Sequence, residues 1–255
     1  MPTIKDSVRF NFNGVWSDSF NIMSVVLDNS MYEETFVADR NLIETKTRGS
    51  NKPLLHGVEE DTLKFPLSIA FIGKFDDVLL DGIIDWLFVD SYKPLYFEGK
   101  EDRVYMCMPF ESSNIIHNGM KEGYITLNMR CDSSHLYSQV ITTPISTIST
   151  MDIVTIINDG HVVVYPEVSI LKNGAGTVSI ENLSDGGSIL DIHNLTDQED
   201  IYLDSKREVI ETDITGVYRY DDIIGYFPRL VKGENKIKIT GACTIQFRYK
   251  KEYKF

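Results

Sequence analysis

The stretch FPRLVKGENKIKITG (227–241) combines a glycine-containing turn with strict alternation of lysine and isoleucine. Gly233 can adopt positive φ without steric cost, so it suits the turn before the alternation. Ile237 and Ile239 then point to one face and the lysines to the other, which is the period of a half-buried β-strand. The segment TIQFRYK (244–250) repeats the pattern, so the sequence predicts an antiparallel pair of strands over a core.

Alternating apolar residues recur along the chain, separated by turn residues. In VRFNFNG (8–14) the alternation ends at Asn13-Gly14, a pair typical of the type I′ hairpin turn. Leu63–Phe71 and Tyr124–Cys131 are longer segments of the same kind, and NGAG (173–176) predicts a further hairpin turn. These signals indicate a mainly β fold.

One segment has the period of a helix instead. In DDVLLDGIIDWLFV (76–89), Leu79, Ile83 and Leu87 fall on one face, and aspartates occupy the opposite face. The two aspartates at its start favour a helix N-terminus there. We therefore expect one amphipathic helix in the first half of the chain.

The Ser/Thr-rich, proline-interrupted stretch TTPISTIST (142–150) is the best candidate for a domain boundary. We expect an N-terminal β-rich domain at 1–141, which contains the helix. A linker at 142–152 and a C-terminal β-sandwich domain at 153–255 follow. The predicted fold class is mainly β, with two β-rich domains.

The composition excludes several classes of function. Acidic residues outnumber basic ones 38 to 25, whereas a general nucleic-acid binder needs a basic surface. No apolar run predicts a membrane helix, and the N-terminal stretch lacks the apolar region of a secretory signal. Cys107, Cys131 and Cys243 are far apart without C-x-x-C spacing, so we expect buried free thiols in a protein assembled in cytoplasm.

No motif predicts catalysis, a cofactor or a metal. The sequence lacks G-x-S-x-G, H-E-x-x-H and a phosphate-binding loop that ends in G-K-[ST]. The aspartates of the helix have the spacing of a solvated face, Cys131 and His135 lack a second ligand pair, and DQED (197–200) lacks the spacing of a calcium loop. We expect no catalytic residue, no metal and no cofactor, and a hydrolase with paired carboxylates ranks last among the hypotheses.

The segment RNLIETKTRGSNKPLLHG (40–57) has a turn-rich tip, RGSNKP (48–53), and few large hydrophobic residues in its middle. One interpretation is a long surface hairpin. The other is an arm that reaches a neighbouring subunit, because a hairpin with few core residues gains little by folding back alone. The residues expected at an interface between subunits are Leu42, Ile43, Thr45, Arg48, Gly49, Leu54 and Leu55.

Several of these segments, taken in order, resemble one known family. FNFNGVWSDSFNI (10–22), the hairpin with Arg48-Gly49 and the helix that ends in DWL (85–87) are similar to the first half of the distal tail proteins (the Dit family) of long-tailed siphophages. IYLDSKREV (201–209) and the opening stretch, 227–241, are similar to its second half. The resemblance covers nearly the whole chain.

The resemblance implies a structural virion protein of the tail tip and not an enzyme. Both domains would be β-sandwiches. Six copies would form a hexameric ring through the first, which would carry the helix and a protruding β-hairpin, and the second would be galectin-like and lie outside the ring. The implied partners are the tail tube protein, the central tip protein (tail-associated lysin or tail fibre) and receptor-binding or adsorption proteins. DNA would pass through the ring without specific binding, and assembly would occur in the host bacterial cytoplasm without membrane insertion.

The alternative hypothesis is a carbohydrate-binding β-sandwich module. The segment YRYDDIIGYF contains Tyr218, Tyr220, Tyr226 and Phe227, whose rings could stack on sugars. Alternating aromatic residues in a strand are more often core residues, so the tail-tip hypothesis ranks first.

Overall fold

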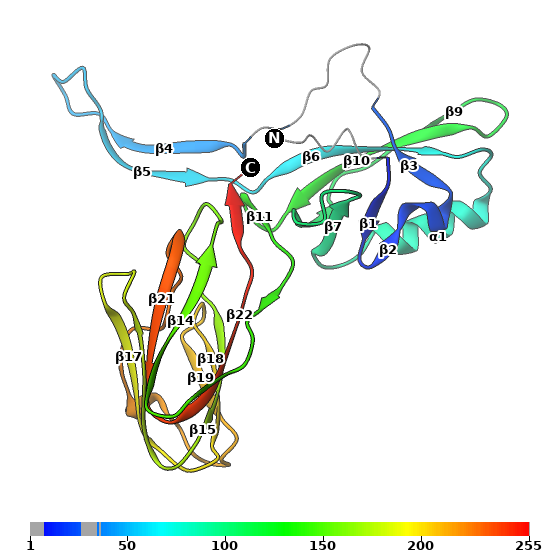
Figure 1. The fold of residues 1–255 in the computed structure, drawn as a ribbon. Coiled ribbons are helices and arrows are strands. Elements are labelled where there is room, and N and C mark those ends of the chain that lie inside the picture. Colours follow the sequence, from blue (N-terminus) through cyan, green and yellow to red (C-terminus); the bar gives the residue numbers. More distant parts are fainter. Residues whose placement is uncertain (1–7, 27–34, 36, 255) are drawn as a thin grey trace. The chain divides into compact units, whose positions relative to one another are not determined.

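The computed structural model describes residues 8–26, 35 and 37–254, and Figure 1 shows the fold. The chain divides into two compact units. The first unit is Met1–Tyr137 together with Lys254–Phe255, and the second unit is Ser138–Tyr253. Both are built mainly from antiparallel β-strands, which confirms the predicted mainly β fold class with two domains.

The first unit contains one curled sheet with the strand order β2-β1-β7-β8-β10-β6-β3, and β9 pairs with β10. A separate two-stranded sheet is formed by β4 and β5. Asn13 and Gly14 both have positive φ, which confirms the predicted turn between β1 and β2. The strands of this unit are β1 Phe10–Phe12, β2 Val15–Trp16, β3 Ile22–Ser24, β4 Arg40–Thr45, β5 Leu54–Glu60, β6 Lys64–Phe71, β7 Lys93–Phe97, β8 Tyr105–Pro109, β9 Ile115–His117, β10 Gly123–Cys131 and β11 His135–Tyr137.

The predicted helix is α1 (Asp77–Leu87), which packs its apolar side against this sheet (Figure 1). Its start is fixed by Asp76, whose carboxylate accepts a hydrogen bond from the backbone N–H three residues later at 2.8 Å. Trp86 is buried and stacks on Phe20 with ring centroids 4.6 Å apart. Its indole N–H donates to the Phe12 carbonyl at 2.9 Å, so this one side chain ties the helix to β1.

The second unit is a sandwich of two sheets around one core. One sheet has the order β12-β22-β15-β18-β19, with β13 also on β22, and the other has the order β14-β21-β16-β17-β20. Buried residues of both sheets, such as Ile170 and Ile180, belong to one apolar cluster. Its likeness to galectins stays a prediction.

The strands from the start of the second unit to the chain end are β12 Ile141–Thr142, β13 Ser146–Ile148, β14 Met151–Asn158, β15 Glu167–Lys172, β16 Gly176–Asn182, β17 Ser188–Leu195, β18 Asp200–Asp204, β19 Val209–Thr212, β20 Ile223–Gly225, β21 Gly233–Thr240, β22 Cys243–Tyr249 and β23 Glu252–Lys254. Short 3-10 helices occupy Ser17–Phe20 and Tyr220–Asp222.

The stretch 227–241 contains β21, and its alternation is confirmed because Ile237 and Ile239 are fully buried. The predicted pairing of this strand with β22 is wrong, since β21 lies between β14 and β16 whereas β22 belongs to the opposite sheet. Gly241, with a φ of 106°, turns the chain from one sheet to the other. Asn173–Gly176 likewise joins β15 to β16 across the sandwich, so the hairpin predicted there is also wrong. Alternation determines the buried face of a strand but not its partner.

The segment 142–152, predicted as a linker, lies within the sandwich of the second unit. β12 and β13 both pair with β22, and Ile148 is buried between the sheets. The threonines and isoleucines of this segment suit a strand as well as a loop, which is why its composition alone resembled a linker. Independent folding of the two units stays a prediction.

Candidate functional site

β4 and β5 form a hairpin, here called the arm (residues 40–60), which adds no buried side chain to the first unit. Leu42 lies opposite Val58 and Thr45 lies opposite Leu54. The register shifts between Ile43 and Glu44. Every residue of the two strands is exposed except Gly57, which is half-buried. Figure 1 shows the arm as a separate ribbon beyond the main sheet of the first unit. Side chains on both of its faces are therefore open to solvent.

The arm exposes large apolar side chains that the monomer does not bury. Leu42 and Leu54 are each 62% exposed, and Ile43, Leu55 and Val58 are exposed as well. The residues that the sequence predicts at a subunit interface all lie on this arm: Leu42, Ile43, Thr45, Arg48, Gly49, Leu54 and Leu55. Adjacent exposed apolar side chains on an isolated hairpin are typical of a surface that a partner covers. The role of these residues at an interface stays a prediction.

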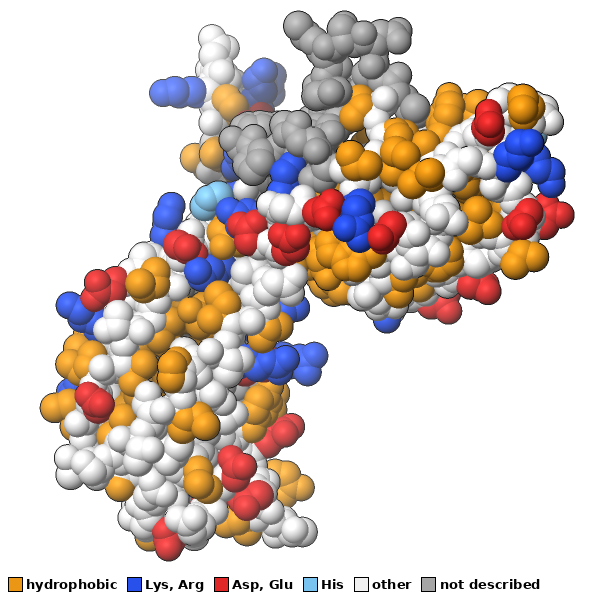
Figure 2. Space-filling view, turned by 45° about the vertical axis from the view of Figure 1, so that its right-hand side comes forward, with side chains coloured by type: hydrophobic (Ala, Val, Ile, Leu, Met, Phe, Trp, Pro, Cys, Tyr) orange, Lys and Arg blue, Asp and Glu red, His pale blue; other side chains and the backbone are white. Residues whose placement is uncertain are grey.

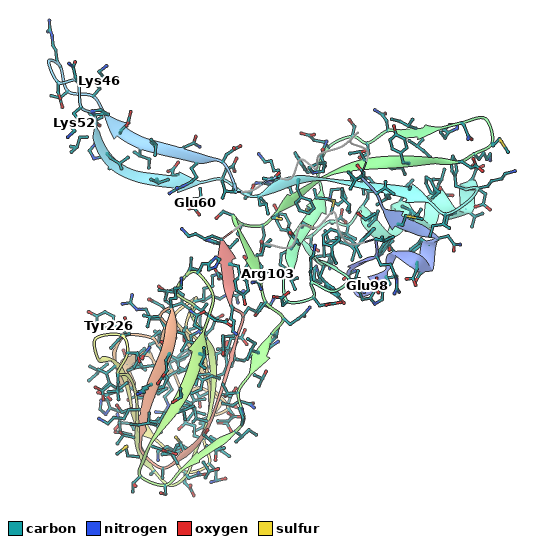
Figure 3. The ribbon with its side chains drawn as sticks, turned by 45° about the horizontal axis from the view of Figure 1, so that its top comes forward. Lys46, Lys52, Glu60, Glu98, Arg103 and Tyr226 are labelled. Atoms are coloured by element: carbon teal, nitrogen blue, oxygen red, sulfur yellow. The ribbon has the colours of Figure 1, made fainter. Side chains whose placement is uncertain are left out.

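The tip of the arm is an ordered turn with a concentrated positive charge. Ser50 closes the turn, because its N–H donates to a carbonyl three residues earlier at 3.0 Å and its hydroxyl accepts from the Lys52 N–H at 3.1 Å. Lys46, Arg48 and Lys52 lie within this turn and beside it. Figure 3 shows Lys46 and Lys52 at the far end of the arm from Glu60. Such a tip fits an acidic acceptor surface.

The base of the arm is held by Glu60. Its carboxylate accepts a hydrogen bond from the Ser134 hydroxyl at 3.1 Å and lies 3.4 Å from Lys254 Nζ and 3.7 Å from Arg40 Nε. The Ser134 hydrogen bond is the largest reason that the pKa of Glu60 is below its ordinary value, and Lys254 and His135 lower this pKa further. Charged contacts thus fix the root of the arm while its strands remain exposed.

The other side chains considered as ligands do not come together. Within residues 8–26, 35 and 37–254, no group of three or more His, Cys, Asp or Glu residues could hold a metal ion. The predicted solvated face of α1 is confirmed because Asp77, Asp81 and Asp85 are exposed. Cys131 is a buried free thiol beside no such group. On the face drawn in Figure 2, acidic and basic side chains are interspersed and form no continuous basic surface. No helix among the described residues is long and apolar enough to cross a membrane.

The aromatic segment 218–227 differs from its predicted role in the core. Tyr218 is 83% exposed and Tyr226 is 76% exposed, and Tyr220 is exposed as well. The buried Arg219 holds this segment through ion pairs. The signal that separates it from a core strand is the Asp-Asp pair and the glycine that interrupt its alternation. The predicted core role is therefore wrong for these three tyrosines, whereas Phe227 is half-buried and packs against the apolar core of the second unit.

A mainly β chain of two units, with a projecting apolar arm and no metal or catalytic cluster in its described part, has the features of a structural assembly protein. Two family models match it in order, one described as "Phage tail protein N-terminal domain" at residues 5–133 and one as "Phage tail C-terminal domain" at residues 136–249. The chain belongs to this family of phage tail proteins. It is therefore a structural component of a virion and not an enzyme.

A curated relative matches this chain over nearly the full length of both proteins. The "SPbeta prophage-derived uncharacterized protein YomH" of Bacillus subtilis (strain 168) is 30% identical over 251 residues, which is 98% of this chain and 99% of that protein.

Solved structures share the fold. The Dit protein of phage SPP1, described as a paradigm of the hub adsorption apparatus in phages that infect Gram-positive bacteria, has a TM-score of 0.69 at 14% identity and covers 96% of this chain and 98% of its own. A chain of the phage P2 baseplate, activated with Ca, has a TM-score of 0.51 at 8% identity over 92% of both chains. The Sr form gives 0.52 over 98% and 99%. The predicted resemblance to the distal tail family is confirmed at the level of the fold.

Proposed function

We propose that this chain is the hub subunit of a siphophage tail tip and that six copies form a ring through their arms. The ring joins the tail tube protein to the central tip protein, the tail-associated lysin or tail fibre. Its outer surface supports adsorption proteins. The similarity in fold to the SPP1 Dit protein over nearly the whole chain supports this assignment.

The observation that carries the proposal is the exposed apolar arm. Covering Leu42 and Leu54, each 62% exposed, with a neighbouring subunit favours association by about 2–4 kcal/mol before the costs of assembly are subtracted. Within residues 8–26, 35 and 37–254 the strands of the arm pair only with each other, so this part of the chain leaves the two leucines exposed. Reaching a neighbour is the way in which these residues contribute to stability.

A ring also needs a second, different surface that receives the arm, since a closed ring of identical copies uses heterologous contacts. The outer side of α1 has the complementary properties. Val78 is 80% exposed there and Ile84 is exposed, and both can pack on the leucines of the arm. Asp81 and Asp85 on the same helix are exposed and carry the charge opposite to that of the arm tip. We assign this surface as the acceptor.

The net charge of −13 supports a channel through which DNA passes without being held. A basic lining would bind phosphates and slow the DNA, whereas a neutral or acidic one leaves it free to slide. The three free cysteines, all buried, are consistent with assembly in a reducing cytoplasm before the host is lysed.

A double variant of the arm, Leu42→Asp with Ile43→Asp, tests the proposal. Two carboxylates at the contact leave the arm unable to pack on a neighbour, so size-exclusion chromatography with light scattering should give a folded monomer. The matched control is Ile153→Asp with Ile157→Asp, which changes two exposed strand residues in the second unit and should leave the assembly intact. Equal assembly of both double variants would contradict a role for the arm.

A further inference from the structure

The second unit contains a cleft of about 490 Å³, and no residue of the arm lines it. Four segments line it: the chain just before β15, the turn between β16 and β17 with the start of β17, the turn between β18 and β19, and the chain that follows β20. Tyr165 and Tyr226 contribute exposed aromatic rings, and Figure 3 labels Tyr226. The volume of the cleft falls in the range of small-molecule binding sites. The cleft thus combines room for a ligand with aromatic surface.

Charged side chains in the cleft are held in a fixed plane. Arg229 donates from Nε to Asp185 Oδ2 at 2.6 Å and from Nη2 to Asp185 Oδ1 at 3.1 Å. This bidentate pair occupies two of the five guanidinium N–H groups, Tyr165 also interacts with the guanidinium, and the remaining N–H groups can meet further acceptors. A planar donor and acceptor set of this kind matches neighbouring hydroxyl groups on a rigid ring.

Ser205 provides an independent sign of a ligand. It lines the cleft and is 2% exposed, yet its hydroxyl has no hydrogen-bond partner among the described residues. Buried polar groups are nearly always paired, so a buried hydroxyl without a partner in a cleft calls for an explanation. Because this oxygen is enclosed in the free protein, a polar ligand gives it a partner only by drawing the Ser205 side chain round towards the cleft.

The charge balance of the cleft indicates which ligand fits. Asp185 and Glu208 bring two carboxylates against the single guanidinium of Arg229, so an anionic ligand is disfavoured. Tyrosine rings offer flat apolar surface for the C–H faces of a pyranose, while Arg229, Asp185 and Ser205 offer donors and acceptors for its hydroxyls. We propose that this cleft binds a neutral saccharide. The proposal goes beyond ring assembly and does not depend on it, because no residue of the arm takes part.

The test uses the full chain and two substitutions. Wild-type protein is applied to an array of neutral oligosaccharides built from hexoses and N-acetylhexosamines, and the hits are measured by saturation-transfer NMR and calorimetry. Tyr226→Ala removes the exposed ring and should weaken binding about tenfold or more. Arg229→Gln should weaken it similarly. The matched control is Tyr218→Ala, which removes an equally exposed ring outside the cleft and should leave the affinity unchanged.

Binding of neutral sugars that Tyr226→Ala loses and Tyr218→Ala retains would support the proposal. An array without hits at millimolar sugar, or binding that both tyrosine variants weaken equally, would overturn it. A preference for anionic glycans would also overturn it, because the two carboxylates would then oppose the ligand. So would a Tyr226→Ala variant that loses a tail-protein partner while no sugar binds.

Discussion

Breaking the buried ion pair of Arg219 with Glu199 is predicted to cost more stability than breaking an exposed pair in the second unit. Arg219 Nε and Nη2 each donate to the Glu199 carboxylate at 2.8 Å, and both side chains are almost fully buried. Thr212 Oγ1 at 2.7 Å and the Thr196 N–H at 2.9 Å complete the contacts of the carboxylate. Arg219→Ala leaves this carboxylate buried without its cation, which should cost about 3–5 kcal/mol of unfolding free energy.

Urea unfolding of the full chain, followed by circular dichroism, measures this loss. Arg248→Ala is the matched control, because Arg248 pairs with Glu167 at 3.0 Å on the surface and its loss should cost less than about 1 kcal/mol. If Arg219→Ala lowers the unfolding free energy no more than this control does, the Glu199 carboxylate does not need its buried cation.

The same pair predicts a dependence on pH. Burial would raise the pKa of Glu199, but hydrogen bonds from Arg219, Thr196 and Thr212 outweigh it and lower this pKa. A carboxylate with a lowered pKa stabilises the fold above its unfolded pKa, and that contribution is lost as the pH falls through the folded value. The difference between wild type and Arg219→Ala should therefore be largest near neutral pH and shrink below about pH 4. A difference that does not change with pH would contradict this assignment.

Three further predictions concern the cysteines, metals and units. The three thiols should resist iodoacetamide in the folded chain and react in urea, because all three are buried. Burial also raises the pKa of Cys243 to about 11, which keeps this thiol protonated. Rapid labelling without urea would contradict their burial. Exhaustive chelation should leave the unfolding midpoint unchanged, and a fall that one divalent ion restores would reveal a metal site. A fragment that starts at Ser138 should fold alone, judged by dispersed amide NMR signals, whereas one that starts at Met151 should be less stable because it lacks the buried Ile148. Equal stability of the two fragments would show that β12 and β13 add nothing.

The sequence predicted those features that depend on local periodicity and turn chemistry. The alternation of β21, the Asn13-Gly14 turn and the helix that carries Trp86 all follow from side-chain spacing within one segment. The exposed arm followed from its turn-rich tip and from the scarcity of large hydrophobic residues in the middle of the segment. Each of these features is determined by residues that are neighbours in the chain.

The predictions that were wrong concern features that depend on residues far apart in the chain. The Gly241 turn is compatible with a hairpin or with a crossing between two sheets, and only the packing of β21 on β14 and β16 selects the crossing. The exposure of Tyr226 likewise depends on the pairing of β20 with β17, which the Tyr226 N–H extends by donating to the Ile189 carbonyl at 2.9 Å. The cleft brings together Tyr165, Ser205 and Arg229, whose distances along the chain give no sign that they are neighbours in space.

Electron microscopy of the purified full chain tests whether six copies assemble into a ring. We expect closed rings of six subunits, in which the arm of one subunit contacts α1 of the next. In native mass spectrometry the ring should have six times the 29.1 kDa mass of the chain. Rings should be absent when Leu42 and Ile43 are both replaced by aspartate. A protein that remains monomeric at every concentration, or rings whose arms extend into solvent without touching a neighbour, would contradict this expectation.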